Sequence, residues 1–453
     1  MKKNSALIMV LISAILLRLI NINQSFWMDE SISAMVVKNY NLVEIITKFI
    51  RADTHPPLYY LLLDIWSLLF GYSEFSLRIP SLIFGVLTVY VIYKIGKIYS
   101  EKAGIYISIL MAVAPLHIYY SQESRMYTMT AFLAVLAVYF YLKKKWLVWG
   151  FSLLFLGASD YLPLAILPVF WLHSYLNKDE LKNAKMFLVG HLPLAAFLIL
   201  WSPVLISQSN STRMYLEKFP EWRSVLGSAN LKDLLLVPVK FAIGRISFDN
   251  QSFYFLVAST ILLLISYILF KGFKAWKNLS VIWLWLIIPF VISFAGSFVV
   301  PGFSYFRMLF ILPALYILLG FSFTKIQKGE IYFFVFSMIS LGFSFTYLLN
   351  SSFWREDWRG TVAFIENNLG ENELVIVSYP EPFTPYLWYS NKKGKITTFD
   401  KTNCSDLTGI YSLDYLMDLT DPQRKYYQGL RLMGFTEKAV YNFRGVGQVR
   451  YWK

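Results

Sequence analysis

The feature that most constrains the fold of this chain is a succession of apolar stretches along residues 5–350. A transmembrane helix needs about 20 mostly apolar residues, and the stretches approach or reach that length. Composition points the same way: 57% of the 453 residues are hydrophobic and only 15% are charged, whereas soluble domains are roughly a quarter charged. We therefore predict a polytopic α-helical membrane protein of about 11 spans, at residues 5–22, 76–98, 103–121, 126–142, 146–159, 161–176, 185–206, 253–270, 279–300, 303–322 and 330–350.

The net charge of +14 would suggest nucleic-acid binding in a soluble protein. Here, however, lysines and arginines gather in short clusters between the apolar stretches, as they do in cytoplasmic loops of membrane proteins. With the N-terminus in the cytoplasm, every cluster falls on the cytoplasmic side, so we predict this orientation and no nucleic-acid partner. The clusters are YKIGKIYSEK (93–102), KKKW (143–146), NKDELKNAK (177–185), KGFKAWK (271–277) and TKIQKGE (324–330).

The start of the chain, MKKNSALIMVLISAILLRLI, resembles a secretory signal peptide. The polar and bulky NINQSFW that follows contains no small-residue cleavage site, so we expect a retained first span. The single cysteine, Cys404, excludes an internal disulfide and has no metal-ligand spacing around it.

Residues 56–71, PPLYYLLLDIWSLLFG, are apolar but contain Asp64 and are about 16 residues long. If this segment crossed the membrane, every later lysine cluster would face outward. We therefore predict an interfacial or re-entrant helix on the outer face. Residues 23–75 then form one long outer loop, and residues 207–252 form a second.

From residue 351 the composition changes. EDWRGTVAFIENNLGENELVIVSYP (356–380) predicts an amphipathic helix, a stop at Gly370 and a strand. DPQRKYYQGLRLMGF (421–435) predicts another helix, and KAVYNFRGVGQVRYWK (438–453) predicts a strand and hairpin. We predict two domains: a membrane domain at 1–350 and a small extracytoplasmic α/β domain at 351–453.

Two adjacent carboxylates, Asp29 and Glu30, follow the first span. Acidic residues are favoured at a helix N-terminus for electrostatic reasons alone. The alternative is that one of them removes a proton from a hydroxyl, which contributes typically about 10²–10⁴-fold to a rate. A base beside the bilayer suits a substrate with its reactive end at the headgroup level and its tail in lipid.

Three further motifs place charges at predicted outer helix ends. RADTHPPLYY (51–60) holds Asp53 and His55 before a rigid Pro-Pro pair; an ordinary loop histidine remains the simpler interpretation. YYSQESRMYT (119–128) and VVPGFSYFRMLFILPALY (299–316) carry charges where burial in a membrane is costly, so an anion-binding role competes with internal pairing or snorkelling. The charged residues are Glu123 and Arg125 in the first and Arg307 in the second, and Arg78 in SLRIPSLIFG has the same ambiguity.

Together these motifs resemble those of the GT-C superfamily of lipid-sugar-dependent membrane glycosyltransferases. The similarity is to the family 39, protein mannosyltransferase-like and aminoarabinose-transferase-like branch, and it covers nearly all of the membrane part. It depends on the order of FWMDE (26–30), HPPLYYLLL (55–63), SEFSLRIPS (73–81), YYSQESRMYT (119–128), YFRMLFILPALY (305–316) and DWRGTVAFI (357–365).

The resemblance implies an inverting glycosyltransferase that moves a sugar from a polyprenyl-phosphate donor to an acceptor hydroxyl on the outer face of the cytoplasmic membrane. The acceptor is a lipid, a glycan or a protein. Asp29, with its neighbour Glu30, matches the catalytic carboxylate position. The donor phosphate would be bound by His55, Arg125, Arg307 and Tyr305, supported by Asp53, Gln122, Glu123 and Arg78.

One motif departs from the family pattern. Aminoarabinose-transferase relatives carry Glu-Lys before the proline, where this chain has Thr54 and His55. The sequence therefore fixes no cofactor and leaves dependence on a divalent metal open. A membrane transporter or flippase remains an alternative, as does a polymerase or ligase of lipid-linked glycans, although no internal repeat of the transporter kind is present.

Overall fold

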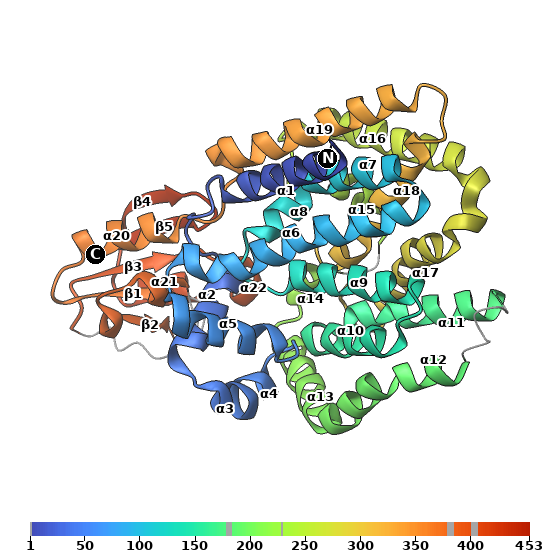
Figure 1. Cartoon of the computed structure of the whole chain (residues 1–453). Helices are drawn as coiled ribbons and strands as arrows, with labels where there is room; N and C mark the ends of the chain where they lie inside the picture. The colour runs from blue at the N-terminus through green and yellow to red at the C-terminus, as the bar shows by residue number, and fades with distance from the viewer. Residues whose placement is uncertain (1, 178–183, 228–229, 378–384, 400–405) are drawn as a thin grey trace.

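The structure is a computed structural model that describes residues 2–177, 184–227, 230–377, 385–399 and 406–453. A bundle of helices carries a small β-sheet beyond one end (Figure 1). Helix α1 runs toward the sheet. Cys404 and parts of the predicted segments 177–185 and 356–380 lie outside the described residues.

Every predicted span coincides with a helical segment. These are α1 (Lys2–Leu19), α6 (Glu74–Tyr99), α7 (Glu101–Ala112) with α8 (Pro115–Ser121), α9 (Tyr127–Leu142), α10 (Trp146–Ser159), η2 (Leu162–Ile166) with α11 (Leu167–Leu176), α12 (Ala184–Gly190) with α13 (Leu192–Lys218), α16 (Gln251–Gly272), η4 (Phe273–Leu279) with α17 (Ser280–Gly296), η5 (Arg307–Ile311) with α18 (Leu312–Phe323), and α19 (Gly329–Leu349).

Within the described part of the chain, five helices are long and apolar enough to cross a membrane, or six if the bent pair α7–α8 counts as one span. The other predicted spans fall on shorter apolar helices. The helical nature of each stretch is thus confirmed, while the total of 11 crossings stays a prediction.

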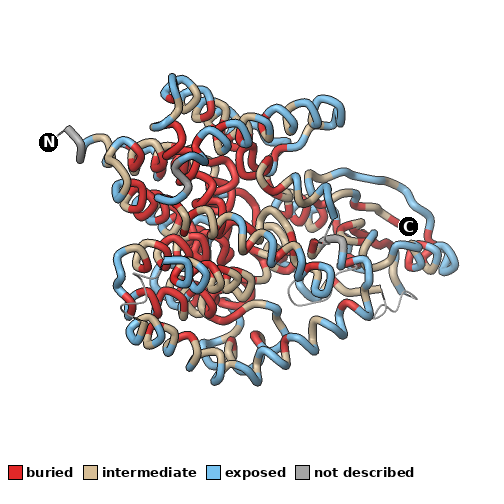
Figure 2. The backbone as a smooth tube through the Cα atoms, turned by 90° about the vertical axis from the view of Figure 1, so that its right-hand side faces the viewer, coloured by how far each residue is buried: buried red, intermediate tan, exposed pale blue. Residues whose placement is uncertain are grey.

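The surface of the bundle is apolar where a bilayer would cover it. Buried residues concentrate inside the bundle, and the outlying helices are largely exposed (Figure 2). Large apolar side chains account for much of that exposure, including Leu200 on α13, Leu263 on α16 and Phe334 on α19, which are 80%, 70% and 64% exposed. Contiguous exposed apolar surface of this kind marks contact with a membrane or partner, and it supports a multi-pass membrane protein.

The predicted span 103–121 is broken into α7 and α8, which are bent by 60°. Pro115 opens α8 and has no N–H to donate, so the helix cannot continue through it. Arg18, which is fully buried, donates to the carbonyls of Met111 and Ala112 at 3.3 and 3.1 Å. Because these carbonyls lie at the end of α7, Arg18 satisfies acceptors that the break exposes.

The predicted outer loops are themselves largely helical. Residues 23–75 contain α2 (Met28–Asn39), α3 (Leu42–Glu44), η1 (Ile45–Phe49), α4 (Ile50–Ala52) and α5 (Leu58–Phe70). In the second predicted outer loop, α13 continues to Lys218, beyond the predicted end of the preceding span at residue 206. After it come α14 (Trp222–Leu226) and α15 (Leu231–Ile243).

The C-terminal region contains the predicted strands and helices. Its elements are η6 (Ser351–Phe353), α20 (Trp358–Asn368), β1 (Glu373–Val377), α21 (Pro385–Tyr389), η7 (Lys393–Lys395), β2 (Ile396–Thr398), β3 (Gly409–Leu413), α22 (Met417–Thr420), α23 (Lys425–Leu432), β4 (Glu437–Phe443) and β5 (Gly447–Trp452). The strand order is β2-β1-β3-β5-β4. Strand β1 is parallel to β2 and β3, and β5 is antiparallel to β3 and β4.

Helix α2 joins this sheet region to the bundle. Met35 of α2 packs into the same apolar core as Trp358 and Tyr386 of the C-terminal region. Just before α2, the backbone N–H of Phe26 donates to the Tyr389 hydroxyl at 2.7 Å. The C-terminal region therefore helps to fix the helix that carries Asp29 and Glu30.

Candidate active site

The two adjacent carboxylates have different environments. Asp29 and Glu30 both lie in the first turn of α2. Successive residues of an α-helix are rotated by about 100°, so their side chains leave the helix in different directions. Glu30 is fully buried, whereas Asp29 is partly exposed.

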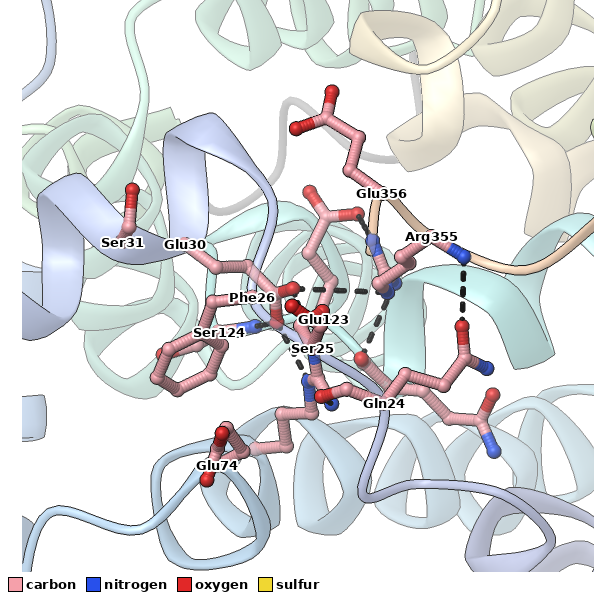
Figure 3. Close-up of polar contacts among 12 residues, drawn as sticks. Gln24, Ser25, Phe26, Glu30, Ser31, Glu74, Glu123, Ser124, Arg355 and Glu356 are labelled. Atoms are coloured by element: carbon pink, nitrogen blue, oxygen red, sulfur yellow. Dashed lines mark hydrogen bonds and ion pairs between the residues drawn. The ribbon is translucent and has the colours of Figure 1, made fainter. Parts of the chain in front are cut away.

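Glu30 is the acceptor in a buried ion pair with Arg78 (Figure 3 shows the surroundings of Glu30). Arg78 donates to its two oxygens at 2.7 and 2.6 Å, and the N–H of Ser124 donates at 2.9 Å. Burial alone would raise the pKa of Glu30, but the charges of Arg78 and Arg355 outweigh it and lower that pKa below its usual value. Both oxygens of Glu30, which was predicted beside Asp29 as a catalytic residue, thus accept from internal donors.

Arg78, predicted as a supporting residue, also fixes the chain that leads into α2. It is fully buried and donates to the carbonyls of Gln24 and Ser25 at 2.7 and 3.2 Å. One guanidinium thus ties α6 to both the entry and the first turn of α2.

A second buried arginine comes from the C-terminal side. Arg355 donates to Glu123 at 2.8 Å and lies 3.6 Å from a Glu30 oxygen (Figure 3). Burial, together with the nearby charge of Glu30, raises the pKa of Glu123 to about 7 even though Arg355 opposes the shift. Glu123 is therefore a member of this buried cluster, in which two carboxylates meet two guanidinium groups.

Gln122 also has a structural position. Its amide donates to the carbonyls of Arg18 and Ile20 at 2.9 and 2.7 Å, and its oxygen accepts from the Tyr347 hydroxyl at 2.9 Å. These bonds hold the end of α1 against α19 and the loop after α8.

Arg125 lies on the other side of this loop and faces the first outer region. Its guanidinium donates to the Tyr60 hydroxyl at 2.8 Å and lies 3.4 Å from the His55 ring. His55 is in turn 3.4 Å from Asp53, which also accepts from Tyr60 at 3.0 Å. Although burial opposes ionisation, His55 and Arg125 lower the pKa of Asp53 to about 2. The motif at 51–60 therefore meets the motif at 119–128 in the folded chain.

Asp29 lies close enough to this group of residues to act on it electrostatically. Its charge acts on both Arg125 and Tyr127. Among the described residues, none forms a hydrogen bond or ion pair with its carboxylate. Asp29 is thus the carboxylate of the pair that has no partner among the described residues.

Arg307 approaches the same place from the start of η5. It is partly exposed, and its charge acts on Tyr127, the residue that also interacts with Asp29. Tyr305, two residues earlier, interacts with Tyr120 and with Arg245. The structure therefore brings Asp29, Arg125, Arg307 and Tyr305 around the start of α9.

Arg245 belongs to this site but was not predicted. It follows α15, and its guanidinium donates to the Tyr119 hydroxyl at 2.7 Å and lies 4.8 Å above the Tyr119 ring. The Trp27 ring, two residues before Asp29, is 5.9 Å away. The available signal was the single cation in GRISFDN (244–250), a segment of a predicted outer loop. The signal for Arg355 was weaker, since it consisted only of a position just before the DWRGTVAFI motif.

Glu356 is a second carboxylate on this side, also not predicted. Figure 3 shows it directed away from the Glu30–Arg355 cluster. It accepts from the Trp358 indole at 2.6 Å and from the Tyr415 hydroxyl at 3.2 Å. Burial raises its pKa to about 7, a shift to which the charge of Asp29 adds and which Arg245 opposes.

This pKa predicts a pH-dependent stability. A carboxyl whose pKa is higher in the folded protein than its ordinary 4.5 stabilises the fold below that ordinary value, and this stabilisation is lost as pH rises through about 7. We expect wild-type protein to lose thermal stability between pH 5 and 8 relative to Glu356→Gln, which stays neutral. Melting temperatures of both proteins across this range test the prediction, and parallel curves would contradict it.

A cavity of about 560 Å³ adjoins the His55 side of the site. Gln208 of α13 donates to the His55 carbonyl at 2.9 Å. The lining combines polar groups with apolar side chains that are exposed at the bundle surface: Thr54, Tyr161, Leu205, Gln208, Ser209, Thr212, Arg213, Leu216, Glu217, Arg223, Val299, Val300 and Pro301.

Within the residues that the structure describes, no group of three or more histidine, cysteine, aspartate or glutamate side chains is arranged to hold a metal ion.

The fold and the site define a multi-pass membrane protein with acidic and basic residues gathered where the helices meet an appended sheet. Residues 54–206 match the family model described as dolichyl-phosphate-mannose-protein mannosyltransferase. None of the curated proteins matches the sequence.

Two solved structures share the fold over the whole chain. The crystal structure of ArnT from Cupriavidus metallidurans bound to undecaprenyl phosphate aligns with a TM-score of 0.62 at 12% identity, covering 99% of this chain and 97% of that one. The apo state of the same protein gives 0.62 at 11% identity, covering 100% and 98%. The predicted resemblance to the GT-C superfamily and its aminoarabinose-transferase-like branch is confirmed at the level of fold.

Proposed function

We propose that the protein is an inverting glycosyltransferase that moves a sugar from a polyprenyl-phosphate donor to an acceptor hydroxyl at the outer face of the cytoplasmic membrane. The observation that carries this proposal is an Asp29 carboxylate that no described residue pairs with and that acts electrostatically on Arg125 and on Tyr127, a residue on which Arg307 acts as well. A base next to several cations suits a reaction in which one group loses a proton while another leaves as a phosphate.

In this mechanism Asp29 accepts the proton of the acceptor hydroxyl as its oxygen attacks the anomeric carbon of the donor sugar. A new C–O bond forms on one face of that carbon while the bond to the phosphate breaks on the other, which inverts the configuration. The bond electrons leave with the polyprenyl phosphate. No strong general acid is required, because a phosphate is already a competent leaving group.

Cations around Asp29 stabilise the charge of the departing phosphate. Arg125 and Arg307 are the principal cations. Arg245, His55 and the uncharged hydroxyl of Tyr305 add further hydrogen-bond donors. At 4 Å and an effective dielectric constant near 20, one such contact is worth about 4 kcal/mol before desolvation. Glu30 has no direct part in this step, since Arg78 and Ser124 occupy its oxygens.

The cavity beside His55 gives the donor a route from the membrane. Val299 and Val300 are 83% and 64% exposed on its rim, where a polyprenyl chain would find apolar contacts. Polar residues such as Gln208 line the part next to His55. A similar fold in a protein crystallised with undecaprenyl phosphate supports a carrier of this class.

The function is tested by mass spectrometry of lipids from cells with and without the gene, and by assay of the purified protein in nanodiscs. We expect a polyprenyl-phosphate sugar to accumulate without the gene, and the purified protein to release polyprenyl phosphate as sugar reaches the acceptor. Movement of intact donor across the membrane without its consumption would indicate a flippase and refute the proposal.

The cations are tested by Arg307→Ala and Arg125→Ala. Because a hydrogen bond to a charged group contributes about 1.5–3 kcal/mol, we expect the KM for the donor to rise by about 10- to 100-fold and the KM for the acceptor to change little. Lys271→Ala, an exposed cation at the end of α16, is the control. Equal weakening of both substrates would count against phosphate binding by these arginines.

A further inference from the structure

A second cavity, of about 280 Å³, lies in the C-terminal region, and none of its lining residues belongs to the candidate active site. Four of them, Arg424, Tyr427, Gln428 and Arg431, are spaced as i, i+3, i+4 and i+7, so they share one face of α23 and its N-terminal flank. The opposite face packs into the apolar core through residues such as Leu430. Glu437 of β4 and Arg450 of β5 complete its lining.

The three arginines that line this cavity differ in how far their charge is matched. Arg450 is fully engaged, because Asp414 accepts from it at 3.0 Å and Glu437 at 2.7 Å. Arg431 is exposed; its guanidinium lies 5.9 Å from the Trp452 ring, and no described residue bonds to it.

Arg424 is only partly engaged. One terminal nitrogen donates to Asp418, whose side chain is 87% exposed, while the other terminal nitrogen is buried and has no partner among the described residues. A buried donor without an acceptor is costly and calls for an explanation such as an absent ligand. Among the described residues, Arg431 thus has no hydrogen-bond partner for its guanidinium, and Arg424 has a partner for only one of its two terminal nitrogens.

The backbone at Arg424 is held in an unfavourable conformation. Its φ is +53°, in the left-handed region that a residue with a Cβ adopts at a cost. Asp421 fixes this turn: its carboxylate accepts from the N–H groups of Lys425 and Tyr426 at 3.0 and 3.1 Å, and its carbonyl accepts from Arg424 at 2.9 Å. The turn therefore holds the Arg424 side chain beside the cavity, at the expense of local strain.

We infer that this cavity binds an acidic sugar unit, through the phosphate or carboxylate group that it carries. Guanidinium groups bind both oxyanions with paired hydrogen bonds, and Arg424 and Arg431 have the free donors. Gln428 is exposed; its amide nitrogen donates to the Gln423 carbonyl at 3.3 Å, and its amide oxygen can accept from neighbouring hydroxyls. The volume lies just below the range of about 300–1,000 Å³ that is usual for small-molecule sites, which fits one sugar residue. This site does not depend on the function proposed for Asp29.

The experiment uses the full chain in nanodiscs and measures binding by isothermal titration calorimetry with inorganic phosphate, glucose 1-phosphate, glucuronate and glucose. We expect saturable binding of at least one acidic sugar, none of glucose, and an affinity that falls with added salt. Glucuronate or glucose 1-phosphate binding alone would identify a carboxylate or a phosphate ligand, respectively. Binding of inorganic phosphate alone, or of no probe, would overturn the inference.

Variants then locate the binding. Arg431→Gln and Arg424→Gln should each weaken binding by about tenfold or more, the equivalent of 1.4 kcal/mol. Lys425→Gln, an exposed neighbour on α23 that does not line the cavity, should leave it unchanged, as should Asp29→Asn. Arg431 has an exposed side chain, so its variant keeps the test valid even if Arg424→Gln fails to fold. Equal binding by Arg431→Gln and wild type would place the ligand elsewhere.

Discussion

Replacing Asp29 by asparagine is expected to lower the rate of sugar transfer by about 10²- to 10⁴-fold, the range that a general base contributes. Asparagine has nearly the same size but cannot accept the proton of the acceptor hydroxyl. Since no described residue bonds to the Asp29 carboxylate, the substitution removes no internal contact. The loss should therefore appear in kcat, measured with donor and acceptor in nanodiscs, while the melting temperature stays close to that of wild type.

A matched control is Glu44→Gln, in the same outer region. Glu44 pairs with Lys48 at the surface at 2.7 Å and has no place in the proposed reaction. We expect its variant to transfer sugar at the wild-type rate. Normal turnover by Asp29→Asn would remove Asp29 from its assigned role, and a large loss in Glu44→Gln would show that the outer region is sensitive to charge in general.

The second large effect is on stability. Arg78→Leu should lower the free energy of unfolding by about 3–5 kcal/mol, because removing one partner of a buried ion pair leaves the other charge buried and uncompensated. Here that charge is Glu30, which is fully buried. The carbonyls of Gln24 and Ser25 would also lose their donor. Thermal unfolding and the yield of folded protein in detergent measure the loss.

Arg359→Gln provides the control for Arg78→Leu. Arg359 pairs with Glu74 at the same kind of distance, 2.7 Å, but its side chain is 48% exposed, and exposed pairs contribute only about 0–1 kcal/mol. We also expect Glu30→Leu combined with Arg78→Leu to recover part of the stability, since neither charge is then left alone. Similar losses in Arg359→Gln and Arg78→Leu would mean that burial does not set the strength of the Glu30 pair.

These predictions separate two neighbouring carboxylates that the sequence treated together. Asp29 and Glu30 follow each other in FWMDE, and local sequence assigns both to the start of a helix. Only the packing of α6 and the loop after α8 against α2 places Arg78 and Ser124 on Glu30 alone. Which carboxylate remains free is thus decided by contacts 48 and 94 residues away in sequence.

The missed residues have the same explanation. Arg245 and Arg355 lie in connecting segments with no periodic pattern, and both reach Tyr119 in the folded chain. Their partners come from α8 and from the loop after it, more than 100 residues earlier. A sequence lists such cations but does not say which of them converge.

The sequence by itself determined the helical membrane class, the place of each apolar helix, and the helices α20 and α23 with the strands β1, β4 and β5 of the C-terminal region. It also supplied the motifs on which the candidate site is built. It did so because apolar length and periodicity are local properties that a bilayer or a sheet imposes directly on a segment. Tertiary structure alone decided the burial of Glu30, the positions of Arg245 and Arg355 beside Tyr119, and the packing of α2 into the C-terminal core. Those outcomes depend on charges and side chains that are distant in sequence, whose interaction becomes strong only once folding removes water from between them.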